Sequence, residues 1–339
     1  MKKIILIFIV LQISVFSLQA QDASNEKAEL LRTNQELGAS FKAEKWDESL
    51  KLAQKAINLN IKIYGEETIE TAAAFKNLAI IYRAKKKFDD AIVNFQKAVK
   101  IYRLDADKNE KSIVRTLYDV AVTYYLNEDF WQANKFGLES LSLAEKVFGK
   151  ESKDILLFLV MMREIYTKLN KYNETEDMYI RQYLTARKYF DEDSDELQEI
   201  EDSFSCFAYY NFGMSVSKPR LDRFKAAIKP KKDNTTISEE ATNFFEEGKL
   251  NGGIINGKAK KLVVPNYPQG ARNRFAQGIV LVRVVIDEQG EVESAKAFCG
   301  DKDLRKASES AARASKFSPT IFDGKAVKVT GTIVYNFVQ

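Results

Sequence analysis

Histidine is absent from this sequence of 339 residues, and it contains only two cysteines and five prolines. Histidine is the commonest general base and a frequent ligand of transition metals, so its absence excludes the usual serine or cysteine triads. Two cysteines in separate parts of the chain cannot build a zinc knuckle. The glycines at 252 and 253 lack the Lys-Ser or Lys-Thr pair of a phosphate-binding loop. We therefore predict a protein that is not an enzyme and has no catalytic residue, metal or cofactor.

Long apolar runs are also missing, except at the start of the chain. Lys2 and Lys3 precede a run of 15 residues from Ile4 to Leu18, and Leu18-Gln19-Ala20 has an apolar and a small residue where a signal peptidase would cut. A membrane-spanning helix needs about 20 apolar residues, so this pattern predicts a cleaved signal peptide over residues 1–20 and a periplasmic protein. A retained segment would instead anchor the chain in the inner membrane, facing the periplasm, and only then would we expect membrane association.

The two cysteines, Cys206 and Cys299, lie in different predicted domains. An oxidising periplasm would allow them to form a disulfide. Two separate buried thiols are the simpler interpretation, because free cysteine behaves as a small apolar residue. The sequence leaves both alternatives open.

The charge is nearly balanced, with 52 basic and 48 acidic side chains. This excess is too small to indicate nucleic-acid binding. Residues 218–261 are more basic, with 11 basic and six acidic side chains. The basic stretch could contact an acidic partner or a membrane surface, although a solvated linker accounts for it equally simply.

Five carboxylates near the middle of the chain have the spacing of calcium-loop positions one, three, five, nine and twelve. They are Asp191, Asp193, Asp195, Glu199 and Asp202. Glu196 stands where such a loop needs glycine for its sharp turn, and the last aspartate is shorter than the usual bidentate glutamate. We therefore interpret the cluster as the acidic start of a helix and not as a metal site.

Aromatic residues mark an internal repeat with a period of 42 residues. One series consists of Trp46, Phe88, Phe130 and Tyr172, and a second of Tyr64, Phe148 and Phe190, with Ala106 at the remaining place. Apolar residues between these markers follow helical spacing, and small residues at Ala79 and Ala121 would let paired helices approach closely. Such a period predicts a stacked helical solenoid.

These positions resemble the tetratricopeptide repeat, in the longer form known from kinesin light chains. The glycine that the family uses between the two helices of a repeat is replaced by Glu44, Lys86, Glu128 and Asn170. The first and fourth repeats depart further, with Leu37 and Arg163 at a small position and Thr175 for an alanine. The resemblance implies an all-α solenoid of about four repeats over residues 21–193.

The same resemblance implies a peptide-binding groove on the inner face of the first helix of each repeat. The matching positions are Phe41, Lys76, Ile80, Arg83, Tyr118, Val122 and Tyr125. A mixed apolar and basic groove would suit a peptide segment with a negative charge. Alternatively, these side chains only pack against the helix that follows the last repeat.

The last ninety residues have the pattern of a small α+β domain. Residues 278–287 are almost all β-branched or leucine, a turn follows up to Gly290, and a second strand continues through Phe298. Asp301 stands at the N-cap of a helix whose apolar stripe we assign to Leu304, Ala307, Ala311 and Ala314. Alternating apolar residues from Val327 to Phe337 predict a final strand.

This order resembles the C-terminal domain of the TonB family over residues 250–339, because Tyr267-Pro268 precedes the first helix and Phe317-Ser318-Pro319 follows the second. The resemblance implies an antiparallel sheet with two helices, in a periplasmic domain that binds the N-terminal box of outer-membrane receptors by adding a strand. We expect the strand Val327–Phe337 to form the exposed edge, with the preceding Tyr-Pro shaping the neighbouring turn. The predicted partner-binding residues are Tyr267, Pro268, Val327, Val329, Ile333, Tyr335 and Phe337.

The sequence thus predicts a multidomain chain. Its parts are a signal peptide (1–20), the solenoid (21–193), a capping helix with a basic linker (194–250) and a TonB-like domain (251–339). The capping helix is expected over residues 196–215, with Pro219 preventing its continuation.

We expect the partners to be proteins, either TonB-dependent outer-membrane receptors or other envelope proteins, and not nucleic acid. The favoured function is protein–protein interaction linked to TonB-dependent outer-membrane transport. The alternative is an adaptor or scaffold for envelope assembly with no energy-transducing role. A cleaved anchor, the lack of a transmembrane histidine and the scarcity of proline for a periplasm-spanning stretch favour this alternative.

Overall fold

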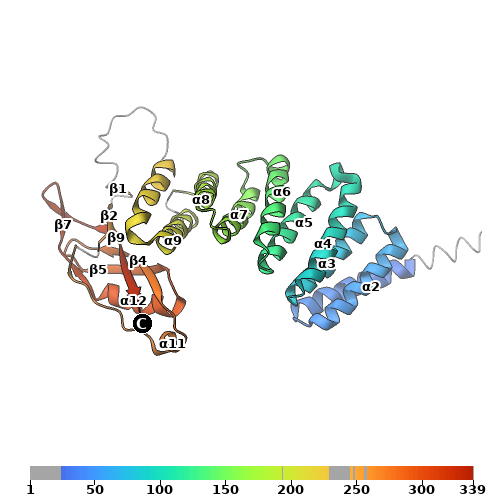
Figure 1. The fold of residues 1–339 in the computed structure, drawn as a ribbon, viewed down its shortest axis with the longest axis horizontal. Helices are drawn as coiled ribbons and strands as arrows, with labels where there is room; N and C mark the ends of the chain where they lie inside the picture. The colour runs from blue at the N-terminus through green and yellow to red at the C-terminus, as the bar shows by residue number, and fades with distance from the viewer. Residues whose placement is uncertain (1–23, 193, 229–244, 247–248, 256–257, 339) are drawn as a thin grey trace, which may run out of the picture. The chain divides into compact units, whose positions relative to one another are not determined.

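A computed structural model describes residues 24–192, 194–228, 245–246, 249–255 and 258–338 (Figure 1). The chain divides into two compact units, Met1–Met178 and Tyr179–Gln339. The expected signal peptide and much of the expected basic linker lie outside the described residues. Within those residues, no helix combines the length and the apolar character needed to cross a membrane.

The first unit consists of helices that stack beside one another in the order in which they occur along the chain (Figure 1). Residues 24–42 form the first helix. It is followed by α2 (Trp46–Tyr64), α3 (Ile69–Ala84), α4 (Phe88–Tyr102), α5 (Ala106–Leu126), α6 (Phe130–Phe148), α7 (Leu156–Lys168) and α8 (Tyr172–Ala186), the last of which runs into the second unit. Short 3-10 turns, Arg103–Asp105 and Lys153–Ile155, precede α5 and α7.

The 42-residue series of aromatic residues marks the start of every second helix. Trp46, Phe88, Phe130 and Tyr172 are the first residues of α2, α4, α6 and α8. Ala79 and Ala121, the predicted small residues, have no exposed surface. They lie in apolar clusters with neighbouring helices, so the close helix packing inferred from the repeat is confirmed.

The turn inside each repeat has a left-handed residue at the position where the family has glycine. Glu44, Lys86, Glu128 and Asn170 have φ angles of 55°, 58°, 61° and 57°. In each case the next residue donates its N–H to a carbonyl five residues earlier, as Lys87 does to Tyr82 at 2.9 Å and Asp129 to Tyr124 at 3.0 Å. This is the Schellman arrangement, which satisfies the free carbonyls at the end of the preceding helix. A non-glycine side chain in this conformation costs about 1–2 kcal/mol.

Substitutions at Lys86 test this account of the turn. Lys86→Gly relieves the left-handed strain but makes the unfolded chain more flexible by about 0.4–1 kcal/mol, so we expect a change in unfolding free energy of less than about 1 kcal/mol. Lys86→Val should lower that free energy by about 1–2 kcal/mol, because a β-branched residue tolerates positive φ least. Urea unfolding followed by circular dichroism measures both variants. An unchanged midpoint for the valine variant would contradict the assignment.

The second unit contains a five-stranded sheet in the order β1-β2-β9-β4-β5. Its strands are β1 (Phe245–Glu246), β2 (Lys249–Ile254), β4 (Gly278–Ile286), β5 (Val292–Cys299) and β9 (Val329–Phe337). Two further pairs of strands lie outside this sheet. Strand β3 (Ala259–Lys261) pairs with β6 (Lys316–Phe317), and β7 (Thr320–Phe322) pairs with β8 (Lys325–Val327). The predicted strands after residue 278 are present, and β4 pairs in antiparallel register with both β5 and β9.

Helix α12 (Lys302–Arg313) covers one face of the sheet, and the short α11 (Gln269–Asn273) precedes β4. Asp301 caps α12 as expected, because its carboxylate accepts the N–H of Asp303 at 3.0 Å. The predicted apolar stripe is partly wrong. Leu304 and Ala311 are buried, but Ser308 and Ala312 complete the buried face, whereas Ala307 is half-buried and Ala314 is exposed.

Helix α9 (Asp195–Ile228) has helical residues on both sides of Pro219, so it extends beyond the predicted range of 196–215. The rings of Phe204 and Phe224 stack with centroids 4.1 Å apart. Twenty residues of straight helix would separate them by about 30 Å, so the chain folds back between them into two arms. Pro219 then stands near the start of the second arm, where its missing N–H removes no helical hydrogen bond.

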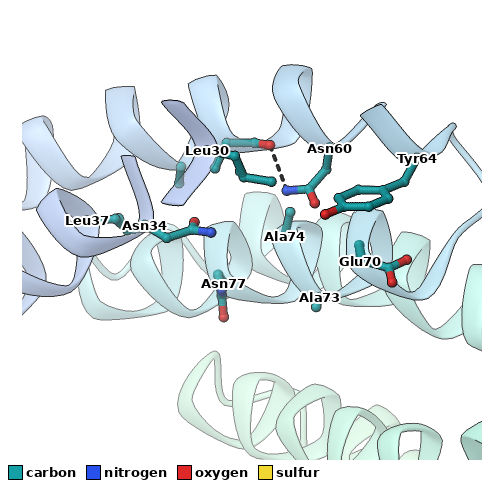
Figure 2. Close-up of a pocket in the computed structure, with 11 residues that line it drawn as sticks. Leu30, Asn34, Leu37, Asn60, Tyr64, Glu70, Ala73, Ala74 and Asn77 are labelled. Carbon is teal, nitrogen blue, oxygen red and sulfur yellow. Dashed lines mark hydrogen bonds between the residues drawn. The ribbon is translucent and has the colours of Figure 1, made fainter. Parts of the chain in front are cut away.

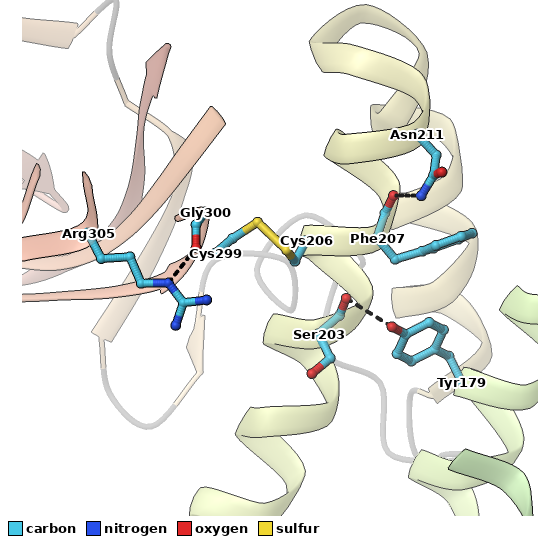
Figure 3. The surroundings of a disulfide bond; sticks show 8 residues. All are labelled: Tyr179, Ser203, Cys206, Phe207, Asn211, Cys299, Gly300 and Arg305. Atoms are coloured by element: carbon cyan, nitrogen blue, oxygen red, sulfur yellow. Dashed lines mark hydrogen bonds between the residues drawn. A yellow bond between two sulfur atoms is a disulfide. The ribbon is translucent and has the colours of Figure 1, made fainter. Parts of the chain in front are cut away.

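The first arm of α9 is covalently attached to the sheet. Cys206 and Cys299 form a disulfide across 93 residues of sequence, with their Cα atoms 5.4 Å apart (Figure 3). Arg283, the one charged side chain in β4, donates two hydrogen bonds to the carboxylate of Asp202, one of them at 2.9 Å. Burial raises the pKa of Asp202, and the facing guanidinium opposes that rise. The cysteines pair because the helix that we expected to cap the repeats lies on this sheet.

Removal of the disulfide should destabilise only the second unit. We expect the double variant Cys206→Ser, Cys299→Ser to lower its unfolding free energy by about 2–4 kcal/mol, because the bridge closes a long loop. The first unit contains no cysteine, so its unfolding serves as the internal control. Hydrogen exchange during denaturant titration separates the two units. Equal protection of β4 and β9 in the variant and the wild type would contradict this expectation.

Candidate functional site

The predicted groove residues occupy equivalent positions on successive helices. Lys76, Ile80 and Arg83 lie on α3, and the residues 42 positions later, Tyr118, Val122 and Tyr125, lie on α5. Phe41, which is 42 positions before Arg83, lies on the helix of residues 24–42. All seven side chains are partly exposed. The repeat therefore places them on the same face of its helices.

The basic part of this face is largely neutralised by an acidic residue that the sequence analysis did not assign. Asp119 on α5 forms ion pairs with Lys76 (Nζ–Oδ2, 3.4 Å) and Arg83 (Nη1–Oδ1, 3.0 Å). These side chains are only 16–23% exposed. Asp119 stands 42 residues after Asn77, so the repeat itself could have indicated its place on this face. One net positive charge is left for an acidic peptide.

The aromatic groove residues also pack within the solenoid. Tyr118 contacts the ring of Phe158 edge to face, with centroids 5.3 Å apart, and Tyr125 contacts Phe130 at 5.5 Å. Burial raises the pKa of both tyrosine hydroxyls. Each ring therefore supports neighbouring helices and still presents part of its surface to solvent, so packing and binding are compatible at these positions.

A pocket of about 280 Å³ opens between the helix of residues 24–42, α2 and α3 (Figure 2). Its apolar wall consists of Leu30, Leu37, Ala53, Ala56, Ala73 and Ala74. Its polar side chains are Asn34, Asn60, Tyr64, Glu70 and Asn77. The amide nitrogen of Asn60 donates to the carbonyl of Ala56 at 2.8 Å. The sequence analysis did not find this pocket.

The expectation that Val327–Phe337 forms an exposed edge strand is wrong. Strand β9 pairs with β4 along its whole length. On its other side β2 runs parallel to it, from the pair Leu250–Val329 to the pair Ile254–Thr332. The N–H of Ile255 donates to Thr332 at 3.1 Å, and the buried side chain of Ile255 lies over Gly331, where a Cβ would come within 2.8 Å of it. The chain segment before the predicted domain thus occupies this edge.

The predicted binding residues of the sheet therefore lie mostly in its interior. Val329, Ile333, Tyr335 and Phe337 are buried, and Val327 belongs to β8. Tyr267 contacts the ring of Phe337 edge to face at 5.3 Å, and its hydroxyl donates to the carbonyl of Ala276. Pro268 is the N-cap residue of α11. The Tyr-Pro pair fixes the turn beside the end of β9, as predicted, but makes no edge.

The outer edge of β5 is covered by side chains instead of by a strand. The carboxylate of Glu309 accepts the N–H of Ala297 at 2.9 Å. The guanidinium of Arg313 donates to the carbonyl of Ala295 at 3.1 Å. Both side chains come from α12 and act where a neighbouring strand would bond. In the described part of the chain, no group of three or more acidic, cysteine or histidine residues is placed to hold a metal.

Comparisons with known proteins agree with this arrangement. Residues 30–104 match the family model "Tetratricopeptide repeat", and residues 263–338 match "Gram-negative bacterial TonB protein C-terminal". Neither of these matched families is catalytic.

Among curated proteins, the chain is similar to the clustered mitochondria protein homolog of Brugia malayi, with 29% identity over 143 residues, which is 40% of this chain and 10% of that protein. The homolog of Aspergillus clavatus is 22% identical over 124 residues, covering 37% of this chain and 10% of that protein. The chain thus spans about a tenth of the length of these relatives.

Two solved structures share the repeat fold. A kinesin light chain protein of Podosopora anserina with nearly identical TPR-like repeats has a TM-score of 0.50 and 14% identity, over 59% of this chain and 94% of that one. BtubC of P. vanneervenii has a TM-score of 0.51 and 13% identity, over 66% and 91%. At these identities the likeness concerns the fold alone.

The charge arrangement around Asp119 makes a testable prediction about the groove. Asp119→Asn keeps the size of the side chain but releases Lys76 and Arg83, so we expect a decaglutamate peptide to bind about tenfold more tightly at low ionic strength. The gain should shrink as salt is added. Calorimetric titration measures the affinity, with Asp107→Asn, an exposed position of the same helix, as the matched control. Equal affinity of Asp119→Asn and wild type would show that the cations do not face the groove.

Proposed function

We propose that this chain, which carries tetratricopeptide repeats followed by a TonB-type C-terminal domain, is a non-enzymatic periplasmic protein linked to TonB-dependent outer-membrane transport. In this proposal the repeats hold one protein partner, and the TonB-type domain binds the N-terminal segment of an outer-membrane receptor. The combination of two interaction domains supports a protein-interaction role. The observation that carries the more specific proposal is the β5 edge, where Glu309 and Arg313 each hold one backbone group and where, within the described residues, Lys316 of β6 bridges to Glu291 just before the strand begins.

Strand addition at this edge requires a small rearrangement. Glu309 and Arg313 each hold one backbone group of β5. Each hydrogen bond to a charged group contributes about 1.5–3 kcal/mol, and rotation of the two side chains away from the sheet would free an N–H and a carbonyl for an incoming strand. The ladder formed with that strand would offset the loss. At β9 a whole strand would have to leave instead.

Three observations support the proposed periplasmic location. The TonB-type domain is an envelope domain of Gram-negative bacteria. The single disulfide suits an oxidising compartment, because disulfides are rare in the cytosol. The first residues have the pattern of a signal peptide.

An adaptor for envelope assembly, without a role in energy transduction, is the second candidate. The five prolines of the chain favour it, because they are too few for an extended proline-rich spacer across the periplasm. In that case the domain would recognise an envelope protein other than a transport receptor.

Removal of the two covering side chains distinguishes these functions. We expect the double variant Glu309→Ala, Arg313→Ala to bind a synthetic peptide with the N-terminal box sequence of a TonB-dependent receptor at least about 100-fold more tightly than wild type, because neither hydrogen bond has to break first. Chemical-shift changes should cluster on β5.

The matched control is Glu293→Ala, Lys328→Ala, which removes an ion pair of β5 whose 3.0 Å contact joins two side chains and involves no backbone group. It should bind the peptide like wild type. No shift on β5 at millimolar peptide, in wild type and both variants, would contradict the transport proposal and favour the envelope-assembly adaptor.

A further inference from the structure

The outer edge of β5 has a lysine between its two covered backbone groups. The N–H of Ala297 and the carbonyl of Ala295 point away from β4, where side chains of α12 form hydrogen bonds to them. Lys296 stands between these two residues. A strand that bonded to the same two backbone groups would bring one of its residues directly opposite Lys296, whether it ran parallel or antiparallel to β5.

The side chain of Lys296 lies on the face of the sheet that α9 covers. Lys296 is opposite Arg283 of β4, and directly opposed residues of paired strands share a face. Arg283 binds Asp202 of α9 on that face, with one hydrogen bond of 2.9 Å. Ala295, in contrast, is buried in the cluster beneath α12. An incoming strand would therefore present its residue opposite Lys296 on the α9 face and the two neighbouring residues on the α12 face.

The ammonium group of Lys296 is available to an incoming strand. Its side chain is exposed, and no ion pair joins it to any other residue that the structure describes. Glu293, the other charged residue of β5, is already paired with Lys328 at 3.0 Å. Lys296 is thus the charge of this strand that a partner can pair with.

The other charges on this face leave that lysine without a close counter-ion. Arg283 and Asp202 neutralise each other through their two hydrogen bonds. Burial raises the pKa of Asp202, and Arg283 and then Lys296 oppose this rise, whereas Glu199 adds to it. Glu199 is exposed and forms no ion pair with Lys296 in the described part of the chain. An acidic residue opposite Lys296 would supply the ion pair that this lysine lacks.

We propose that Lys296 selects the receptor segment that adds to β5, and that this segment carries an acidic residue opposite Lys296 with an apolar residue on either side. Directly opposed side chains have Cβ atoms about 4.5–5.5 Å apart, so a carboxylate there forms a cross-strand ion pair, whereas a cation is repelled. The flanking residues lie beside Ala295 and Ala297, whose methyl side chains leave room for larger ones. This inference rests on the proposed function and names the charge pattern of the partner at the same edge.

Three peptides test the charge pattern on the full chain. The first is Thr-Thr-Val-Glu-Val-Thr-Thr with acetylated and amidated ends, and the other two have glutamine or lysine in place of the glutamate. Titrations followed through the backbone amide shifts of β5 give the affinities. At low ionic strength we expect the glutamate peptide to bind about five- to tenfold more tightly than the lysine peptide, with the glutamine peptide between them. The difference should shrink as salt is added.

Variants of Lys296 connect this preference to one side chain. Lys296→Glu should reverse the order, so that the lysine peptide binds most tightly. Lys296→Gln should bind all three peptides alike, and it serves as the second variant if an added carboxylate near Asp202 impairs folding. The matched control is Lys325→Glu, which changes the charge equally at an exposed lysine of β8, outside the five-stranded sheet. It should keep the order of the wild type.

Equal affinity of the glutamate and lysine peptides, with shifts on β5, would overturn the charge selection and leave the proposed function standing. The lysine would then only discourage unwanted pairing, as charged residues on edge strands do. Retention of the wild-type order in Lys296→Glu would equally overturn the role of Lys296. No shift on β5 with any peptide, in wild type and in Glu309→Ala, Arg313→Ala, would contradict the proposed function as well. The two failures are therefore distinguishable.

Discussion

The turn between the two helices of each repeat is the constraint on which the solenoid depends. Four residues, Glu44, Lys86, Glu128 and Asn170, adopt the same left-handed conformation, and the same backbone hydrogen bond follows each of them. This fixes where the second helix begins and places an aromatic residue at its first position. Because the turn recurs every 42 residues, side chains 42 apart share one environment. The groove face and the position of Asp119 on it follow from that equivalence.

The sheet of the second unit is covered on both faces and along both sides of β9. Helix α12 packs on one face, and α9 packs on the other through the disulfide and the Arg283–Asp202 pair. Such coverage protects backbone groups from unwanted pairing. The two strands are covered in different ways. Strand β2 pairs with β9, whereas two side chains of α12 form hydrogen bonds to the backbone of β5. In the proposed strand addition only the two side chains over β5 would have to move.

Much of this architecture could be predicted from the sequence. The 42-residue period predicted the helical solenoid, and the pattern after residue 278 predicted three strands of the sheet. The stripe of α12 was assigned partly wrongly within one helix, but the larger errors concern contacts between segments that are distant in sequence. Strand β2 contains two glycines and reads locally as a turn, but it pairs with a strand about 80 residues later. Likewise, the second helical arm after the chain reversal was not predicted, because the stacking of Phe224 on Phe204 joins residues 20 positions apart. The pocket was not predicted because its lining comes from three helices that no single stretch of sequence contains.

The cysteine count gives the disulfide a further consequence for maturation of the chain. Two cysteines allow only one pairing within a molecule, so no incorrect intramolecular bridge can form and no isomerase is required to reshuffle one. During vectorial synthesis or export Cys206 emerges first and stays a thiol until the residue 93 positions later arrives. In that interval the only disulfide that Cys206 can form is one with a thiol of another molecule. An oxidant that acts only after β5 has packed on α9 would therefore favour monomers over mixed disulfides.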